Sequence, residues 1–126
     1  MSQWRWPGSR ITRVVDGDTV DTELTRDIGF GGRVTFVVRL RLARINAAKA
    51  SSKRGLAATA AVLAWTGSAP LEVITMKPYK YSGPEDYTGE YMAEVVLPDG
   101  RNLSDLLVAE GLAAYWNGQG PRPADS

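Results

Sequence analysis

The stretch VTFVVRLRLARI, residues 34–45, constrains the fold of this chain most, because it gives the strongest strand signal in the sequence. Its apolar and cationic side chains alternate, so they fall on opposite faces of a strand: Val38, Leu40 and Leu42 on one, Arg39 and Arg41 on the other. After residue 50 the apolar spacing changes from period two to that of a helix. The sequence therefore predicts a sheet that is interrupted by a helix.

This helix is expected to begin at Ser51 or Ser52, either of which suits an N-cap, and to run to about Trp65. Gly67 suits its C-terminal stop. Its apolar residues at helical spacing are Leu56, Ala60, Leu63 and Ala64.

The other elements follow from the same local signals. They are a strand at 11–24 with a break near Gly17, a glycine-rich hairpin connection at 25–33, a strand at 71–77, a polar loop at 77–89, a strand at 91–97, a turn at Pro98-Asp99-Gly100, and a last helix from Asn102 or Ser104 that ends with Tyr115 and Trp116. Three strands, a helix, two strands and a helix predict an α+β, mainly β fold: a five-stranded OB-fold barrel with two helices.

The composition excludes several classes of site. The 126 residues have the size of one domain, and they include no cysteine and no histidine. Disulfides, thiolate nucleophiles, Ser-His-Asp triads and His- or Cys-ligated metals are therefore excluded, and any metal would need oxygen ligands. The net charge of +1 gives no overall attraction to nucleic acid or membranes, so any such attraction must come from a local patch of charge. No apolar run suggests a membrane span and the N-terminus lacks a signal sequence, so we expect a cytoplasmic protein.

The stretch VVDGDTV, residues 14–20, places Asp16 and Asp18 on either side of Gly17. Residues two apart on a strand point to one face, so both carboxylates are expected to lie together and to repel each other unless a cation lies between them. Two interpretations stay open: a solvated hairpin bend, or a metal or phosphate site.

The element order and four ordered motifs resemble the staphylococcal-type thermonuclease family. The motifs are VVDGDTV (14–20), RLRLARINAAK (39–49), DYTGEYMAEV (86–95) and LLVAEGLAAY (106–115). The resemblance covers about residues 11–116 and leaves an N-terminal arm, 1–10, and a flexible tail, 117–126. It implies a thermonuclease-like OB barrel and Ca²⁺-dependent hydrolysis of DNA and RNA by two aspartates, a backbone carbonyl, a glutamate base and two phosphate-binding arginines.

Carried over position by position, the resemblance assigns most of the site. Asp18 stands at the first metal aspartate, beside Asp16 and Thr19, and Arg41 stands at the first phosphate arginine. Ala47 stands at the position whose backbone carbonyl binds the metal, where the side chain matters least. The other four positions are substituted: Asn46 replaces the second metal aspartate, Ala48 the usual proline, Lys49 the catalytic glutamate and Glu90 the second arginine.

These substitutions imply an inactive or impaired nuclease. Calcium affinity follows the charge of the ligands, and Asn46 is uncharged while Lys49 adds a cation. We therefore expect no cofactor, or at most weak Ca²⁺ binding. Lys49 and Glu90 have reciprocal charges, so they are expected either to form a surface ion pair or to act in a swapped site with Glu90 as the base and Lys49 on the phosphate.

Nucleic-acid binding is expected from Arg41, Lys49, Lys77, Lys80 and Tyr79, because interleaved cations and aromatic rings suit a single strand. The basic run continues through Arg39, Arg44, Lys53 and Arg54, and Tyr81 adds a further ring. The alternative for the whole set is a solvated edge.

The aromatic residues near the two ends have open roles. Tyr115 and Trp116 are expected as core or cover residues rather than stacking platforms. Trp4, Trp6 and Pro7 in the arm are expected to fill the space left by the family's last helix, which has no counterpart here, or to dock a partner.

Three functions follow from the sequence. The first is a catalytically inactive or impaired thermonuclease-like protein that binds nucleic acid, preferably single-stranded. The second is a protein-interaction module on a nuclease-like fold. The third is a weak metal-dependent nuclease that uses Asp18, Asn46, Arg41 and Glu90.

Overall fold

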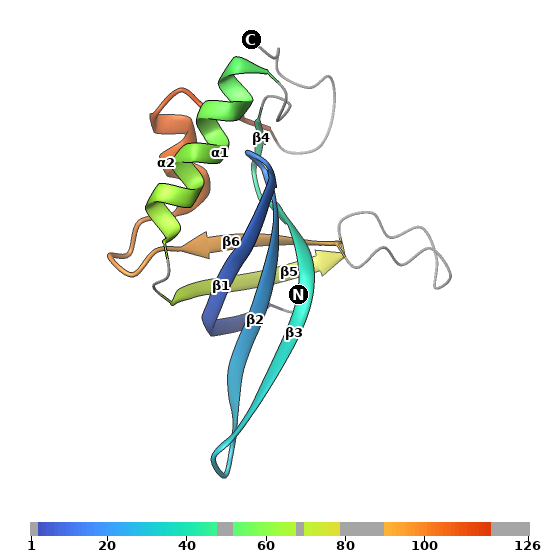
Figure 1. The fold of residues 1–126 in the computed structure, drawn as a ribbon. Helices are drawn as coiled ribbons and strands as arrows, with labels where there is room; N and C mark the ends of the chain where they lie inside the picture. The colour runs from blue at the N-terminus through green and yellow to red at the C-terminus, as the bar shows by residue number, and fades with distance from the viewer. Residues whose placement is uncertain (1–2, 48–51, 68–69, 79–89, 117–126) are drawn as a thin grey trace.

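The structure, a computed structural model, describes residues 3–47, 52–67, 70–78 and 90–116, and for residues 77, 78 and 90 it describes the backbone only. The elements in chain order are β1 (Trp4–Asp16), β2 (Thr19–Gly29), β3 (Gly32–Leu42), β4 (Ile45–Ala47), α1 (Lys53–Thr66), β5 (Leu71–Pro78), β6 (Glu90–Val96), α2 (Leu103–Ala109) and β7 (Ala113–Tyr115). Five strands form a closed barrel in the order β1-β2-β3-β6-β5, and β4 and β7 form a separate two-stranded sheet (Figure 1). The predicted class, mainly β with a five-stranded barrel and two helices, is confirmed.

The barrel is mixed because one of its five pairings is parallel. β3 runs parallel to β6, whereas the other neighbouring strands are antiparallel. The core consists of inward-facing side chains from every barrel strand and from both helices, including Val20, Leu40, Val73 and Leu107, all 0% exposed. Both helices lie on one side of the barrel, at the end where β1 turns into β2 (Figure 1). Neither helix within the described ranges is long and apolar enough to span a membrane.

The helix ends follow the capping signals of the sequence. Ser52 is the N-cap of α1, and its Oγ accepts a hydrogen bond from the amide of Gly55 at 3.0 Å. Gly67, with φ of 45°, ends the helix and donates its N–H to the carbonyl of Leu63. Asn102 caps α2 by accepting from the amide of Asp105 at 3.2 Å. The local chemistry alone was therefore sufficient to place three of the four helix ends near their observed positions.

Several strand boundaries differ from the prediction. The predicted break near Gly17 in the strand at 11–24 is confirmed, but it is a full reversal into two antiparallel strands, β1 and β2. Asp16 and Asp18 therefore do not share a strand face. The expected connection at 25–33 is mostly strand, since the register of β2 and β3 extends to Gly29 and Gly32. The strand predicted to run to residue 45 ends at Leu42, and Arg44, at φ of 71°, turns the chain into β4. A period-two pattern does not report such turns, because it counts side-chain faces and not backbone direction.

The face of α1 that is buried differs from the predicted one. The residues it buries are Gly55, Ala58, Val62 and Thr66, whereas Leu56 and Leu63 are 62% and 52% exposed. The small residues face inward because the β1–β2 turn at Gly17 lies directly against Ala58. Tyr115 and Trp116 do not end a helix, since α2 stops at Ala109 and Tyr115 lies in β7.

The N-terminal residues differ from the predicted arm. Residues 4–10 are the first part of β1, and Trp4 and Trp6 are paired with Thr75 and Val73 of β5. Their pairing with β5 closes the barrel, so within the described chain these residues belong to the barrel wall. The predicted tail at 117–126 and most of the predicted loop at 77–89 lie outside the described residues.

Candidate functional site

The turn between β1 and β2 buries the carboxylate of Asp18. Asp18 is 7% exposed; its Oδ2 accepts the amide hydrogen of Ala47 at 2.9 Å, and its Oδ1 accepts from the hydroxyl of Thr19 at 3.0 Å. Its carbonyl accepts the amide of Leu42 at 2.7 Å. Asp18 therefore ties the turn to β3 and β4 through both its backbone and its side chain.

Arg41 lies beside this carboxylate. Its Nη1 is 3.4 Å from Asp18 Oδ2 and donates to the carbonyl of Leu42 at 3.1 Å. Arg41 is only 6% exposed, although the alternation of side chains along β3 places it on the strand face opposite Leu40 and Leu42. The burial of Arg41 is possible because the β1–β2 turn supplies the carboxylate of Asp18 and β3 itself supplies the carbonyl of Leu42. Without such partners a guanidinium would be far too costly to bury.

Asn46 and Ala47, the other predicted metal ligands, lie in β4. Both are buried, at 6% and 8% exposed, and they pair with Ala114 and Ala113 of β7. The structure thus brings Ala47 to Asp18, but through an N–H donor to the carboxylate rather than as a carbonyl ligand beside it.

The donor set around Asp18 does not fit Ca²⁺. Its carboxylate is occupied by an amide, a hydroxyl and a guanidinium, and no group of three His, Cys, Asp or Glu side chains that could hold a metal ion exists in the described part of the chain. Calcium requires several anionic or neutral oxygens, and the positive charge of Arg41 takes the place beside Asp18 that a dication would need. We therefore derive no metal-dependent step from this site.

The remaining predicted site residues are described only in part. Lys49, Tyr79 and Lys80 lie outside the described residues, and so do the side chains of Lys77 and Glu90. The backbone of Glu90 opens β6 opposite Arg39 of β3. The expected ion pair between Lys49 and Glu90, the swapped site and the basic loop remain predictions.

The basic run that begins at Arg39 is largely neutralised by carboxylates. Arg39 Nε lies 2.7 Å from Asp21, and hydrogen bonding from Arg39 lowers the pKa of Asp21. Arg44 lies 2.6 Å from Glu94 and 2.9 Å from Asp105. With Arg41 paired to Asp18, the arginines Arg39, Arg41 and Arg44 of the basic run are each held by an acid of the same chain.

Tyr115 belongs to the same polar cluster as Arg44. Its hydroxyl donates to Asp105 at 2.8 Å, and the guanidinium of Arg44 lies 5.8 Å from its ring centroid. The hydrogen bond to Asp105 raises the pKa of Tyr115, and the hydrogen bonds from Arg44 and Tyr115 lower the pKa of Asp105. This cluster fastens β7 to α2, so its role is structural.

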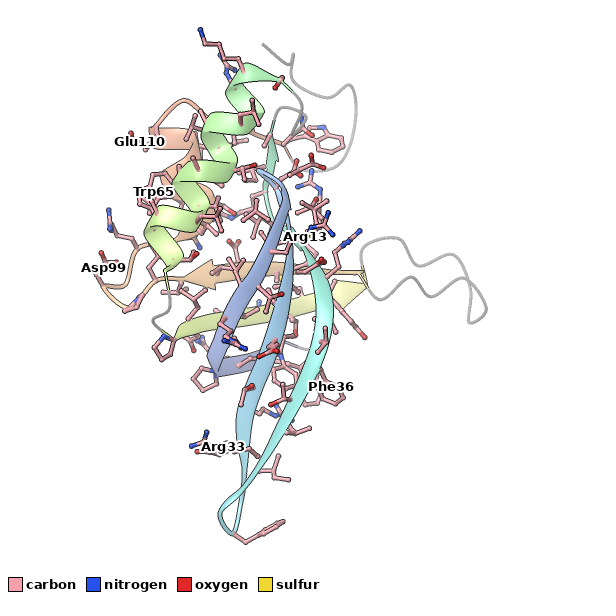
Figure 2. The ribbon with its side chains drawn as sticks, viewed as in Figure 1. Arg13, Arg33, Phe36, Trp65, Asp99 and Glu110 are labelled. Atoms are coloured by element: carbon pink, nitrogen blue, oxygen red, sulfur yellow. The ribbon has the colours of Figure 1, made fainter. Side chains whose placement is uncertain are left out.

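An apolar groove, which was not predicted from the sequence, opens on the barrel at the root of the long β2–β3 hairpin. It has a volume of about 590 Å³, and its aromatic lining consists of Trp4, Trp6, Phe36 and Tyr91. Leu24 and Arg26 of β2 and Val37 and Val38 of β3 complete the wall on the hairpin side. Figure 2 shows Phe36 on the part of the hairpin that extends past β5 and β6.

The groove is built around the indole of Trp6. Its Nε1 donates to the hydroxyl of Thr75 at 3.1 Å, which fixes the ring, and Phe36 contacts it edge-on with centroids 5.7 Å apart. The guanidinium of Arg26 lies 4.7 Å from the ring centroid of Trp6 and 5.2 Å from that of Trp4. Trp4 and Phe36 are each 51% exposed, so two aromatic faces reach solvent beside a cation.

Arg26 differs from most arginines of the described chain. Seven of the ten described arginines form an ion pair with a carboxylate. Arg26 instead contacts indole rings inside an apolar groove, and no carboxylate of the described residues pairs with it. A cation held this way retains its capacity to bind an anionic group of a ligand.

A period-two signal for this groove was present in the sequence. Leu24, Arg26 and Ile28 alternate along β2, and Trp4 and Trp6 alternate along β1. What the sequence did not contain was the pairing of β1 with β5, which brings the tryptophans to the hairpin.

Neither a protein-family model nor a curated protein matches this chain. The fold is that of a five-stranded closed barrel with two helices, which is compatible with OB-fold families.

Proposed function

We propose that this protein binds single-stranded nucleic acid in the groove of Trp4, Trp6, Arg26, Phe36 and Tyr91 and does not cleave it. The observation that carries the proposal is the position of Arg26, a guanidinium over two indoles in an apolar groove without a carboxylate partner among the described residues. A base offers a flat apolar face to the rings, and its phosphate offers oxygens to the arginine.

The size and exposure of the groove support this ligand class. The groove volume of about 590 Å³ falls in the range of ordinary ligand pockets. The half-exposed rings of Trp4 and Phe36 give room for stacking from outside, while the buried Trp6 provides the floor. OB-type barrels commonly bind oligonucleotides on this kind of strand surface.

The absence of cleavage is supported by the arrangement around Asp18. Asp18 and Arg41 occupy two unsubstituted charged positions of the thermonuclease resemblance, and they neutralise each other in a nearly buried pair. Lys49 and Glu90 replace the family's base and second arginine. Arg26 also lies seven residues along β2 from Thr19, or about 23 Å, so a strand stacked in the groove need not reach Asp18.

The binding test uses a fluorescein-labelled oligothymidine and anisotropy at several salt concentrations. We expect salt-dependent binding with a log–log slope reduced by about 0.7 in Arg26→Ala, since one phosphate contact is lost. Trp4→Ala is expected to weaken binding by roughly 5- to 150-fold, the loss of one stacked base. The matched control is Arg33→Ala, which removes the same charge from the same hairpin at a residue paired with Asp27 outside the groove.

Equal losses in Arg26→Ala and Arg33→Ala would mean that the hairpin attracts the strand only by charge, and would overturn the groove as the site. Binding that is unaffected by Trp4→Ala would do the same.

Cleavage is tested on one gel with the same oligonucleotide in Ca²⁺ and in EDTA. We expect intact, shifted DNA in both lanes. DNA shortened only in Ca²⁺, and no longer shortened by Asp18→Ala, would overturn the non-cleaving proposal and favour the weak nuclease.

The groove also favours a second candidate, the protein-interaction module, because its lining is mainly apolar and Val37 in its wall is 76% exposed. An extended peptide with aromatic side chains and one carboxylate would complement the same rings and Arg26. Free DNA in every lane, together with an Arg26-dependent anisotropy change of such a labelled peptide, would replace the first candidate with this one.

A further inference from the structure

The β2–β3 hairpin leaves one strand edge open. β3 is paired with β2 from Gly32 to Arg41, but its pairing with β6 covers only Arg39 to Leu42. The segment 32–38 therefore has no strand on its outer side within the described residues. Figure 1 shows that this part of the hairpin projects well beyond β5 and β6, so a partner can approach its edge without meeting the barrel.

The open edge carries the residues that promote pairing. Its sequence, GRVTFVV, contains β-branched and aromatic side chains, and it lacks the prolines and lysines that usually protect edge strands. The only charge is that of Arg33, which lies 3.5 Å from Asp27 of β2. Phe36 and Val37 are 51% and 76% exposed along this edge. An edge of this length and composition is a template for another strand.

We propose that two copies of this chain pair through segment 32–38 as antiparallel neighbouring strands, with the two-fold axis at Thr35. In this register Val34 of each copy faces Phe36 of the other, and Arg33 faces Val37. Aromatic and β-branched side chains directly opposite each other stabilise antiparallel pairs, and no two like charges are brought together. A two-fold axis supplies the Val34–Phe36 contact twice and brings no like charges together, and this favours a second copy over an unrelated strand.

The side-chain faces agree with this register. Thr35 and Thr25 lie on the same face of the hairpin, with their hydroxyls 2.9 Å apart, while Phe36 is paired with the buried Leu24 on the groove face. An axis perpendicular to the ribbon keeps equivalent faces on the same side, so both grooves open in the same direction. The pairing itself uses backbone groups and segment 32–38 and does not depend on nucleic-acid binding.

The test exploits the absence of cysteine from the chain. Residues directly opposite in an antiparallel pair have Cβ atoms about 4.5–5.5 Å apart, close to the roughly 3.8 Å of a disulfide. Thr35→Cys is therefore expected to form a covalent dimer of twice 13.7 kDa under mild oxidation. Thr25→Cys is the matched control, because it breaks the same Thr–Thr contact on the same face but lies off the edge, and it is expected to stay monomeric.

The non-covalent dimer is measured by light scattering at ~100 μM without nucleic acid, a concentration at which mass action favours association. Wild-type protein is expected to dimerise, Thr35→Lys to be monomeric because two ammonium groups meet at the axis, and Thr25→Lys to remain dimeric. Urea unfolding of both lysine variants confirms that they are equally folded. A monomeric wild type, or equal cross-linking of the two cysteine variants, would overturn the proposal and leave the oligonucleotide result unaffected.

Discussion

The Nη1 atom of Arg41 lies 3.4 Å from Oδ2 of Asp18, and the two side chains are only 7% and 10% exposed. A carboxylate and a guanidinium that are expected to face a metal and a phosphate are thus turned toward each other. Since each charge is buried, each depends on the other for its compensation. This pair is at once a structural element of the barrel end and the reason that the site around Asp18 offers little to an external ligand.

Asp18→Asn is expected to lower the free energy of unfolding by about 3–5 kcal/mol, because it leaves the charge of Arg41 buried without a counter-charge. The measurement is urea unfolding at neutral pH. Asp21→Asn, which removes the acid of the more exposed pair with Arg39, is the control and is expected to cost about 0–1 kcal/mol. Equal losses in the two variants would show that Asp18 acts only as one more surface acid.

Gly17→Ala is expected to destabilise the protein by about 1–3 kcal/mol through overpacking. A Cβ at Gly17 would lie 2.8 Å from Cβ of Ala58 and 2.9 Å from Cβ of Ala47, which is too close for carbon atoms that belong to a helix and a strand. Gly8→Ala is the control, since its new Cβ would find no atom nearer than 3.6 Å. Thermal unfolding of both variants decides the point, and an unchanged midpoint in Gly17→Ala would mean that α1 is free to move outward.

Leu107→Ala is expected to cost about 2–5 kcal/mol, whereas Leu63→Ala is expected to change the free energy of unfolding by less than about 0.5 kcal/mol. Both leucines lie on helices, but Leu107 is 0% exposed and Leu63 is 52% exposed. Chemical denaturation of the two variants tests the observed phase of the helices. A large loss of unfolding free energy in Leu63→Ala would mean that α1 packs through the face that the sequence spacing predicted.

The cluster of Arg44, Asp105 and Tyr115 is expected to make the free energy of unfolding fall as the solution becomes acidic. Hydrogen bonds from Arg44 and Tyr115 hold the folded-state pKa of Asp105 below its unfolded value. Its contribution is therefore complete above the unfolded pKa and is lost as the pH falls through the folded pKa. In Asp105→Asn, the decline of the urea midpoint from about pH 5 to about pH 2 is expected to be shallower than in the wild type. A decline as steep as that of the wild type would assign the acid sensitivity to other carboxylates.

The sequence predicted the fold well because its signals are local. The change of apolar period after residue 50, the serine at the start of α1 and the glycine at its end depend on near neighbours in the chain, and the structure confirms each of them. The candidate site was less predictable. Asp18 and Ala47 do contact each other, but as a carboxylate and an amide donor, which residue identities did not reveal.

The sequence by itself determined the barrel class, the positions of the two helices among the barrel strands and three of the four helix ends, since these depend on side-chain periodicity and on backbone groups a few residues apart. Only the tertiary structure decided that Arg41 is buried against Asp18, that α1 packs through Ala58 rather than Leu56, and that Trp6 and Arg26 meet in one groove. Each of these depends on which distant segments lie side by side. Burial, charge pairing and ring contacts are properties of those neighbours, so no local pattern contains them.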